Sequence, residues 1–129
     1  MSAQHTLVRL EALALIGIGG FAGSNLRYFV GFLAPGILGT LLVNVIGSFV
    51  LGFVLYEAIY SGLLAEQTQI VAGTGFLSSF TTYSTFALES LQASPVLLVG
   101  NVLATYAFGF TGVLAGRTLA RIVDGGETR

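Results

Sequence analysis

Four long apolar segments constrain this chain more than any other feature of its sequence. They lie at about 9–32, 37–61, 68–92 and 96–121, and a helix needs roughly 20 residues to cross the hydrocarbon of a bilayer. Spanning segments must be helices or closed barrels, because backbone polar groups in lipid have to bond within the protein. These segments are too long and alternate too little for barrel strands. The sequence therefore predicts an all-α integral membrane protein, with four transmembrane helices in a single domain over residues 1–129.

The breaks between the segments are short. Pro35 and Gly36 separate the first pair, the stretch SGLLAEQTQ the second and QASPV the third, with Pro95 suited to the first turn of a helix. Neighbouring helices joined so closely must run antiparallel, and an even number of crossings puts both termini on one side. A basic residue precedes the first apolar run, as in a signal peptide, but the run continues to Phe32, so we expect a retained helix.

The arginines indicate an orientation. Arg9, Arg117, Arg121 and Arg129 would lie on the side of the termini, whereas Arg27 lies nearer the other side. Because arginine-rich faces tend to stay cytoplasmic, the pattern favours termini inside the cell and a multi-pass protein of the plasma membrane.

The composition excludes several classes of function. Only 9% of the residues are charged and the net charge is -1, so there is no basic surface for nucleic acid. The chain has no cysteine, which excludes disulfides and thiolate metal sites, and its one histidine, His5, lies in the polar start. We do not expect an enzyme, because no catalytic dyad, nucleophile with a base or phosphate-binding motif is present.

The acidic residues avoid the middle of the first, second and fourth segments. Glu11, Glu57, Glu66 and Glu89 all lie toward segment ends. A proton-coupled small multidrug exporter, which is also short, four-helical and dimeric, would carry a glutamate at mid-membrane depth. That exporter is the chief alternative function. A second alternative is a non-transporting assembly subunit, in which the polar residues only join helices.

Polar residues recur every four positions along two of the segments. They are Thr40, Asn44 and Ser48 in the second segment, and Asn101, Thr105 and Gly109 in the fourth. At this spacing each set lies on one face of a helix. A hydroxyl can bond to the carbonyl one turn back, but a carboxamide buried without partners costs roughly 2–7 kcal/mol. The position of Asn44 therefore favours a functional role over a contact between helices.

The third segment has the most unusual composition. Its stretch GTGFLSSFTTYSTFALE, from Gly73 to Glu89, places serine, threonine or tyrosine at nearly every second position of its centre. Glycine and hydroxyl residues weaken a helix, so we expect a break near residues 76–81. Irregular backbone at that depth has to be buried in protein, line a water-filled path or bind an ion. Exposed carbonyls suit a cation, and the amides that open the next half-helix suit an anion.

Tyr83 and Phe86 stand three positions apart in this stretch. The edges of aromatic rings carry partial positive charge, and an edge at a narrow passage attracts an anion without a full charge that would hold it. Together with the hydroxyls and the amide, these rings favour passive conduction of a small anion.

Glycines at small-xxx-small spacing predict close helix packing, within the chain or between chains. The pairs are Gly19 with Gly23 and Gly112 with Gly116. Four helices cannot enclose a polar path without turning polar groups to lipid, so we also expect a partner chain.

Four motifs, taken in order, cover essentially the whole chain: GGFAGSNLRYF, GTLLVNVIGSFVLG, GTGFLSSFTTYSTFALE and GNVLATYAFG. With these motifs the sequence resembles the Fluc family of fluoride channels, also called CrcB, and the third motif is the most specific. The resemblance implies antiparallel dimers of four-span subunits, two fluoride pores that release toxic fluoride from the cytoplasm, and a structural sodium ion at the dimer centre. The partner would be a second copy of the chain, giving a homodimer, or a sibling subunit, giving a heterodimer.

The resemblance also implies roles for individual residues. The fluoride pore would be lined by Asn44, Tyr83, Phe86, Ser84, Thr85, Asn101 and Thr105. Arg27 would lie at a pore mouth, and the backbone carbonyls of Ser78 and Thr81 would bind sodium. The sequence departs from the family at Tyr83, where phenylalanine is usual, and at Asn101, where many members have tyrosine.

Overall fold

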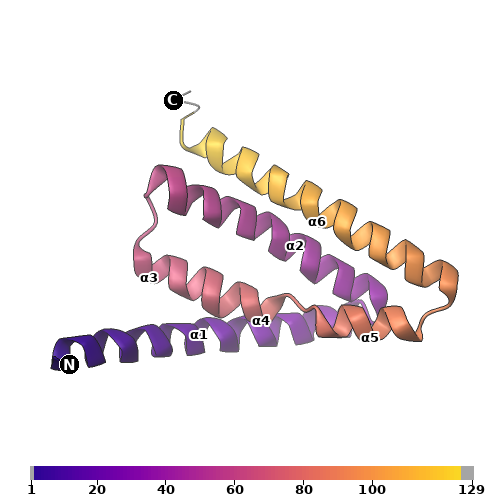
Figure 1. Ribbon diagram of the computed structural model, residues 1–129, viewed down its shortest axis with the longest axis horizontal. Helices are drawn as coiled ribbons and strands as arrows, with labels where there is room; N and C mark the ends of the chain where they lie inside the picture. The colour runs from indigo at the N-terminus through magenta and orange to yellow at the C-terminus, as the bar shows by residue number, and fades with distance from the viewer. Residues whose placement is uncertain (1, 126–129) are drawn as a thin grey trace.

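The computed structural model describes residues 2–125, and the regular structure in this range is entirely helical (Figure 1). The helices are α1 (Ala3–Leu33), α2 (Ile37–Tyr56), the π-helical turn η1 (Glu57–Ser61), α3 (Glu66–Gln69), the π-helix η2 (Ile70–Leu77), α4 (Ser78–Phe80), α5 (Ser84–Gln92) and α6 (Pro95–Val123). Helix α1 begins and α6 ends at the same end of the bundle, on the left in Figure 1. Arg129, one of the arginines that indicated an orientation, lies outside the described residues.

Within residues 2–125, three helical stretches are long and apolar enough to cross a membrane. They are Ala3–Leu33, Ile37–Ser61 and Pro95–Val123, and the second is α2 continued by η1. The expected crossing at 68–92 is divided among α3, η2, α4 and α5, none of which has that length alone. The all-helical membrane fold is therefore confirmed, and the fourth crossing stays a prediction.

The bundle consists of two helix pairs that pack through glycine. Helix α1 lies along η2 and α4, and α2 lies along α6. A Cβ atom on Gly19 of α1 would lie 2.8 Å from the amide nitrogen of Phe76, and one on Gly116 of α6 would lie 3.0 Å from that of Phe53. A side chain at either position would collide with the neighbouring backbone, so glycine allows this close approach. These glycines join helices within one chain.

The third segment is broken, but at the later limit of the predicted window. Helix α4 continues to Phe80, Thr81 then adopts an extended conformation with φ -79° and ψ 159°, and α5 begins at Ser84. The sequence predicts a break near residues 76–81. Residues 76–80 stay helical because the π-helix η2 accommodates the glycine-rich stretch and the hydroxyls of Ser78 and Thr81 bond to carbonyls of the preceding turn.

Two short connections set where helices α2 and α6 begin. Gly36, which follows Pro35, has a φ of 78°, in the left-handed region that favours glycine. The hydroxyl of Ser94 accepts a hydrogen bond from the amide of Leu97 at 3.4 Å and caps α6. Pro95 occupies the first turn of that helix, as the sequence predicted.

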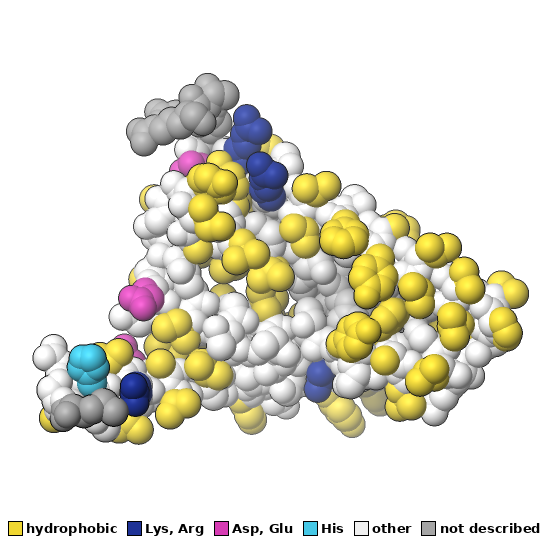
Figure 2. Space-filling model, viewed as in Figure 1, with side chains coloured by type: hydrophobic (Ala, Val, Ile, Leu, Met, Phe, Trp, Pro, Cys, Tyr) yellow, Lys and Arg dark blue, Asp and Glu magenta, His cyan; other side chains and the backbone are white. Residues whose placement is uncertain are grey.

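The outside of the bundle is apolar (Figure 2). Large side chains such as Phe21 and Phe29 of α1 and Phe108 and Leu114 of α6 are exposed. In the most apolar stretch of each of these two helices only 11% of the residues are buried. So large an apolar surface suits lipid acyl chains rather than water, and the protein is a membrane protein.

Candidate functional site

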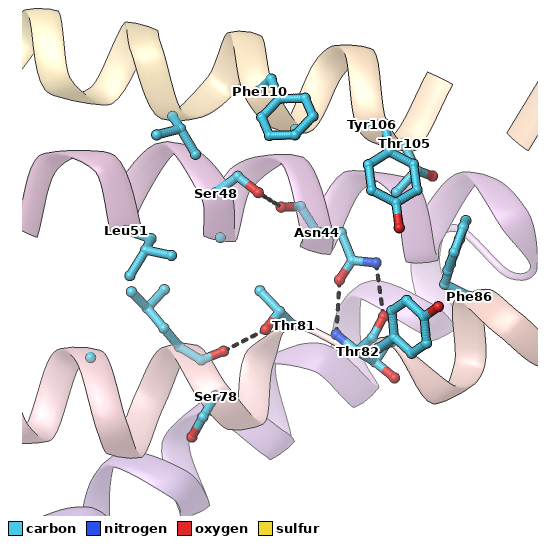
Figure 3. Close-up of a pocket in the computed structure, with 16 residues that line it drawn as sticks. Asn44, Ser48, Leu51, Ser78, Thr81, Thr82, Phe86, Thr105, Tyr106 and Phe110 are labelled. Carbon is cyan, nitrogen blue, oxygen red and sulfur yellow. Dashed lines mark hydrogen bonds between the residues drawn. The ribbon is translucent and has the colours of Figure 1, made fainter. Parts of the chain in front are cut away.

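Two cavities adjoin the break in the third segment. The central cavity, of about 520 Å³, lies between the two helix pairs and is lined from α2, η2, α4, α5 and α6 (Figure 3). Figure 2 shows a hollow between these pairs. The second cavity, of about 530 Å³, is lined from α1, the first half of α2, the break and the start of α5.

Asn44 holds the break by pairing with the backbone of Thr82. Nδ2 of Asn44 donates to the carbonyl oxygen of Thr82 at 2.9 Å, and the Thr82 amide donates to Oδ1 of Asn44 at 2.8 Å (Figure 3). In a continuous helix that amide would donate to the carbonyl of Ser78, so the carboxamide replaces a helical hydrogen bond. Asn44 also lines the central cavity, and its amide group has a second N–H to donate there.

Three hydroxyls beside the central cavity bond to their own helix. Ser48 donates to the carbonyl one turn earlier at 2.7 Å and Thr81 does so at 2.8 Å, while Ser78 donates to two carbonyls of the preceding turn. With their protons directed at the backbone, these hydroxyls present oxygen lone pairs to the cavity. Each must therefore rotate before it can donate to an anion.

A second group of hydroxyls bonds together at the start of α5. Oγ1 of Thr82 donates to Oγ1 of Thr85 at 3.1 Å, lies 3.4 Å from Oγ of Ser84 and accepts from the amide of Thr85 at 3.2 Å. The turn of the backbone at the break brings these three side chains together. Thr82 and Thr85 line the second cavity, whereas Ser84 belongs to neither lining.

Four aromatic rings form a row along the central cavity. Ring centroids lie 5.7 Å apart for Tyr83 and Phe86, 6.4 Å for Phe86 and Tyr106, and 6.2 Å for Tyr106 and Phe110. Phe86 is 6% exposed and meets Tyr106 edge to face, whereas Tyr83 is 73% exposed. Sequence reasoning did not identify Tyr106 and Phe110. They directly follow two residues of the polar stripe in α6 and are four positions apart, a spacing that indicates a shared face.

Arg27 lines the second cavity rather than the central one. Its Nη1 lies 3.5 Å from the carbonyl oxygen of Thr81, at the outer limit of a hydrogen bond. The hydroxyl residues Ser24, Thr40 and Thr85 share this lining. The second cavity therefore combines a full positive charge with hydroxyls, while none of the residues that line the central cavity is charged.

Asn101 lies outside both cavity linings. It is 5% exposed, its Nδ2 donates to Oγ of Ser90 at 2.9 Å, and its Oδ1 accepts from Oγ1 of Thr105 at 3.4 Å. Thr105 and Gly109 do line the central cavity. The polar stripe of α6 thus divides into residues that face the cavity and one that joins α6 to α5.

Two glutamates have a buried carboxylate oxygen with no hydrogen-bond partner among residues 2–125. These atoms are Oε2 of Glu57 and Oε2 of Glu89. Glu57, in η1, is 3% exposed, whereas Glu11 and Glu66 are exposed. Because the ends of membrane segments are normally wet, the sequence did not predict the burial of Glu57.

The chain matches a sequence family described as "CrcB-like protein, Camphor Resistance (CrcB)" over residues 14–117. It is 56% identical over 126 residues to fluoride-specific ion channel FluC 1 of Haloarcula marismortui, and the alignment covers 98% of both chains. Identity is 46% over 113 residues with FluC 1 of Natronomonas pharaonis, covering 86% of this chain and 95% of that one. With FluC 2 of Methanosarcina acetivorans it is 40% over 118 residues, covering 92% and 94%.

Proposed function

Because this chain belongs to the CrcB family, we propose that it is a passive, fluoride-selective channel of the plasma membrane that lets toxic fluoride leave the cytoplasm. Relatives that align over nearly the whole chain are named as fluoride-specific ion channels. The observation that carries the proposal is the central cavity, whose neutral donors and ring edges adjoin a broken membrane helix.

Fluoride is small and holds its water strongly, so a pore must replace that water with several closely placed donors. The central cavity offers the second N–H of Asn44, the hydroxyls of Tyr83 and Tyr106, and the ring of Phe86. None of its lining residues carries a charge that would trap the anion. A narrow path with these partial charges admits fluoride and excludes the larger chloride.

The remaining pore residues would act after a local rotation. The hydroxyls of Thr105 and of the cluster at Ser84 and Thr85 bond to neighbouring side chains, so each can exchange one weak hydrogen bond for a bond to the ion. Asn101, buried between α5 and α6, would contribute by orienting Thr105 rather than by touching the ion.

A partner subunit would complete the path. Tyr83 is largely exposed although its ring borders the cavity that Asn44 and several hydroxyl residues line, and lipid does not cover such polar groups favourably. We propose an antiparallel dimer with two pores, in which each chain covers the cavity of the other. A homodimer requires insertion in both orientations. A heterodimer with a sibling chain is the other arrangement, and the relatives named FluC 1 and FluC 2 are consistent with paired genes.

A structural sodium ion at the dimer centre fits the chemistry of the break. In a continuous helix the amide of Thr82 would donate to the carbonyl of Ser78, but here it donates to Asn44 instead. The carbonyl of Thr81 lies where the helical backbone ends. Unwound carbonyls of this kind suit Na⁺. One chain supplies too few oxygens for a cation, and a twofold axis would double them. Because Arg27 also approaches the Thr81 carbonyl, the guanidinium would have to share it or withdraw.

Efflux from liposomes tests the proposed function. Purified protein is reconstituted into vesicles loaded with potassium fluoride, and valinomycin is added so that potassium carries the balancing charge. Rapid fluoride release without a pH gradient, and little chloride release from matched vesicles, is the expected result. Drug-dependent proton movement would identify an exporter, and absence of flux would identify an assembly subunit.

A further inference from the structure

Thr82 has a position that no other described residue shares, because it lines both the central cavity and the second cavity. Thr82 is only 8% exposed, although it borders both cavities. We propose that Thr82 is the partition between the two cavities, and that its hydroxyl is the donor that passes the anion from one to the other. This inference rests on the proposed function, because it concerns the path of the same ion.

The backbone of Thr82 is fixed, so the partition does not open by moving the chain. Its amide and its carbonyl are both bound to the carboxamide of Asn44, at 2.8 Å and 2.9 Å. A residue held by both of its peptide groups has little freedom to swing. The hydroxyl therefore remains as the part of Thr82 that can respond to an ion.

The hydroxyl of Thr82 is held in a way that lets it turn. Its oxygen accepts from the amide of Thr85 at 3.2 Å, and its proton is donated to Oγ1 of Thr85 at 3.1 Å. Rotation about the Cβ–Oγ1 bond breaks the bond between hydroxyls and leaves the amide in place. The proton can then point at an ion in the central cavity, while the oxygen keeps its position.

The neighbours of Thr82 indicate the order in which an anion would meet the groups along this path. Asn44 lies on the side of the central cavity, and Thr85 lines the second cavity together with Arg27. An anion at Asn44 would meet the Thr82 hydroxyl next and the Thr85 hydroxyl after it. Arg27, the charged residue of the second cavity lining, would then attract it.

Two substitutions test the hydroxyl of Thr82 separately from the shape of the Thr82 side chain. Thr82→Val keeps the branched side chain and removes the donor, whereas Thr82→Ser keeps the donor and removes a methyl group. In the liposome assay Thr82→Val should lower fluoride efflux at least about tenfold, as expected when a hydrogen bond to a charged group is lost. Thr82→Ser should restore most of the rate. The matched control is Thr111→Val, whose hydroxyl bonds to the carbonyl of Ala107 on an exposed face.

The outcomes distinguish this inference from the proposed function. If the wild-type chain releases no fluoride, both are wrong. If the wild type conducts and Thr82→Val conducts equally well, only the role of Thr82 is wrong. Equal losses in Thr82→Val and Thr82→Ser would show that the packing of the complete threonine side chain, and not its donor alone, supports conduction, and would also overturn the inference.

A thiol at the same position gives a second test if Thr82→Val does not fold. Since the chain has no cysteine, Thr82→Cys carries a unique thiol for a small methanethiosulfonate reagent. Labelling should stop fluoride efflux, whereas labelled Thr111→Cys should conduct normally. Efflux that continues after complete labelling of Thr82→Cys contradicts the partition.

Discussion

Asn44 of α2 and Thr82 of the helix break exchange two hydrogen bonds, at 2.9 Å and 2.8 Å, in the manner of paired strands. A side chain on one helix thus satisfies the backbone of another at the point where its own helical bonding stops. The same carboxamide borders the central cavity. Asn44 therefore links the stability of the break to the chemistry of the proposed pore.

We predict that Asn44→Ala affects both stability and conduction. It leaves the amide and carbonyl of Thr82 without partners, a loss of about 1–3 kcal/mol for each buried group, and it should lower fluoride efflux at least about tenfold. Thermal unfolding in detergent and liposome efflux measure the two effects. Thr111→Ala is the control, because the Thr111 hydroxyl lies outside both cavity linings and bonds only to the carbonyl of Ala107 on an exposed face. Normal efflux in Asn44→Ala would contradict the pore assignment.

The second prediction concerns the ring of Phe86. Phe86→Leu keeps an apolar side chain in the buried site, at a cost of roughly 0.5–3 kcal/mol, but removes the ring edge that would face the anion. Since an aromatic contact contributes roughly 0.5–1.5 kcal/mol, we expect fluoride efflux to fall several-fold with the dimer intact on size exclusion. Phe108→Leu, at an exposed position outside both linings, should conduct as the wild type does. Equal efflux rates in Phe86→Leu and Phe108→Leu would show that Phe86 does not line the path of the ion.

Much of the fold was predictable because the bilayer restricts spanning segments to helices or closed barrels. Segment length and apolar composition indicated the long helices, and the spacing of Gly19 with Gly23 and of Gly112 with Gly116 indicated where backbones meet. The position of the break was harder to predict. It depends on Asn44, which is distant in sequence and takes over the Thr82 amide, whereas composition alone pointed to residues 76–81.

The candidate site was predicted less completely, because a helical face does not reveal what lies opposite. Asn101 has the same spacing as its neighbours in the stripe, yet Ser90 of α5 holds it away from the cavities. Tyr106 was not identified from the sequence, because nothing local shows that the ring of Phe86 lies against it. Contacts between helices decided both cases, and no local pattern contains them.

The third prediction compares two glycines in α6. A Cβ atom on Gly116 would lie 3.0 Å from the amide nitrogen of Phe53, whereas nothing lies within 4 Å of one on Gly100. Gly116→Ala should therefore force α2 and α6 apart and cost about 1–3 kcal/mol. Gly100→Ala should instead stabilise the helix by about 0.5–1 kcal/mol. Thermal unfolding of both variants checks the sign of each change in stability. A stabilising Gly116→Ala would contradict the close packing of α2 against α6.

The fourth prediction tests the bond between Asn101 and Ser90. Each single alanine substitution leaves a buried polar group without its partner, so each should cost about 1–3 kcal/mol. The double variant should cost less than the sum, with a coupling energy of about 0.5–3 kcal/mol. Unfolding measurements on the four proteins of the cycle give this coupling. Additive losses, together with strongly reduced efflux in Asn101→Ala alone, would favour direct contact of Asn101 with the ion.

The last prediction concerns the buried carboxylate of Glu57, whose Oε2 has no hydrogen-bond partner within the described part of the chain. A buried acidic group without partners destabilises a fold, and glutamine has almost the same shape without the charge. Glu57→Gln should therefore raise the free energy of unfolding by about 1–3 kcal/mol, whereas Glu66→Gln, at an exposed position, should change it little. A marked loss of stability in Glu57→Gln would mean that a partner subunit or a bound cation satisfies the carboxylate. Repeating the measurement in sodium and in potassium salts would separate these two explanations, because only a bound cation makes the loss depend on the salt.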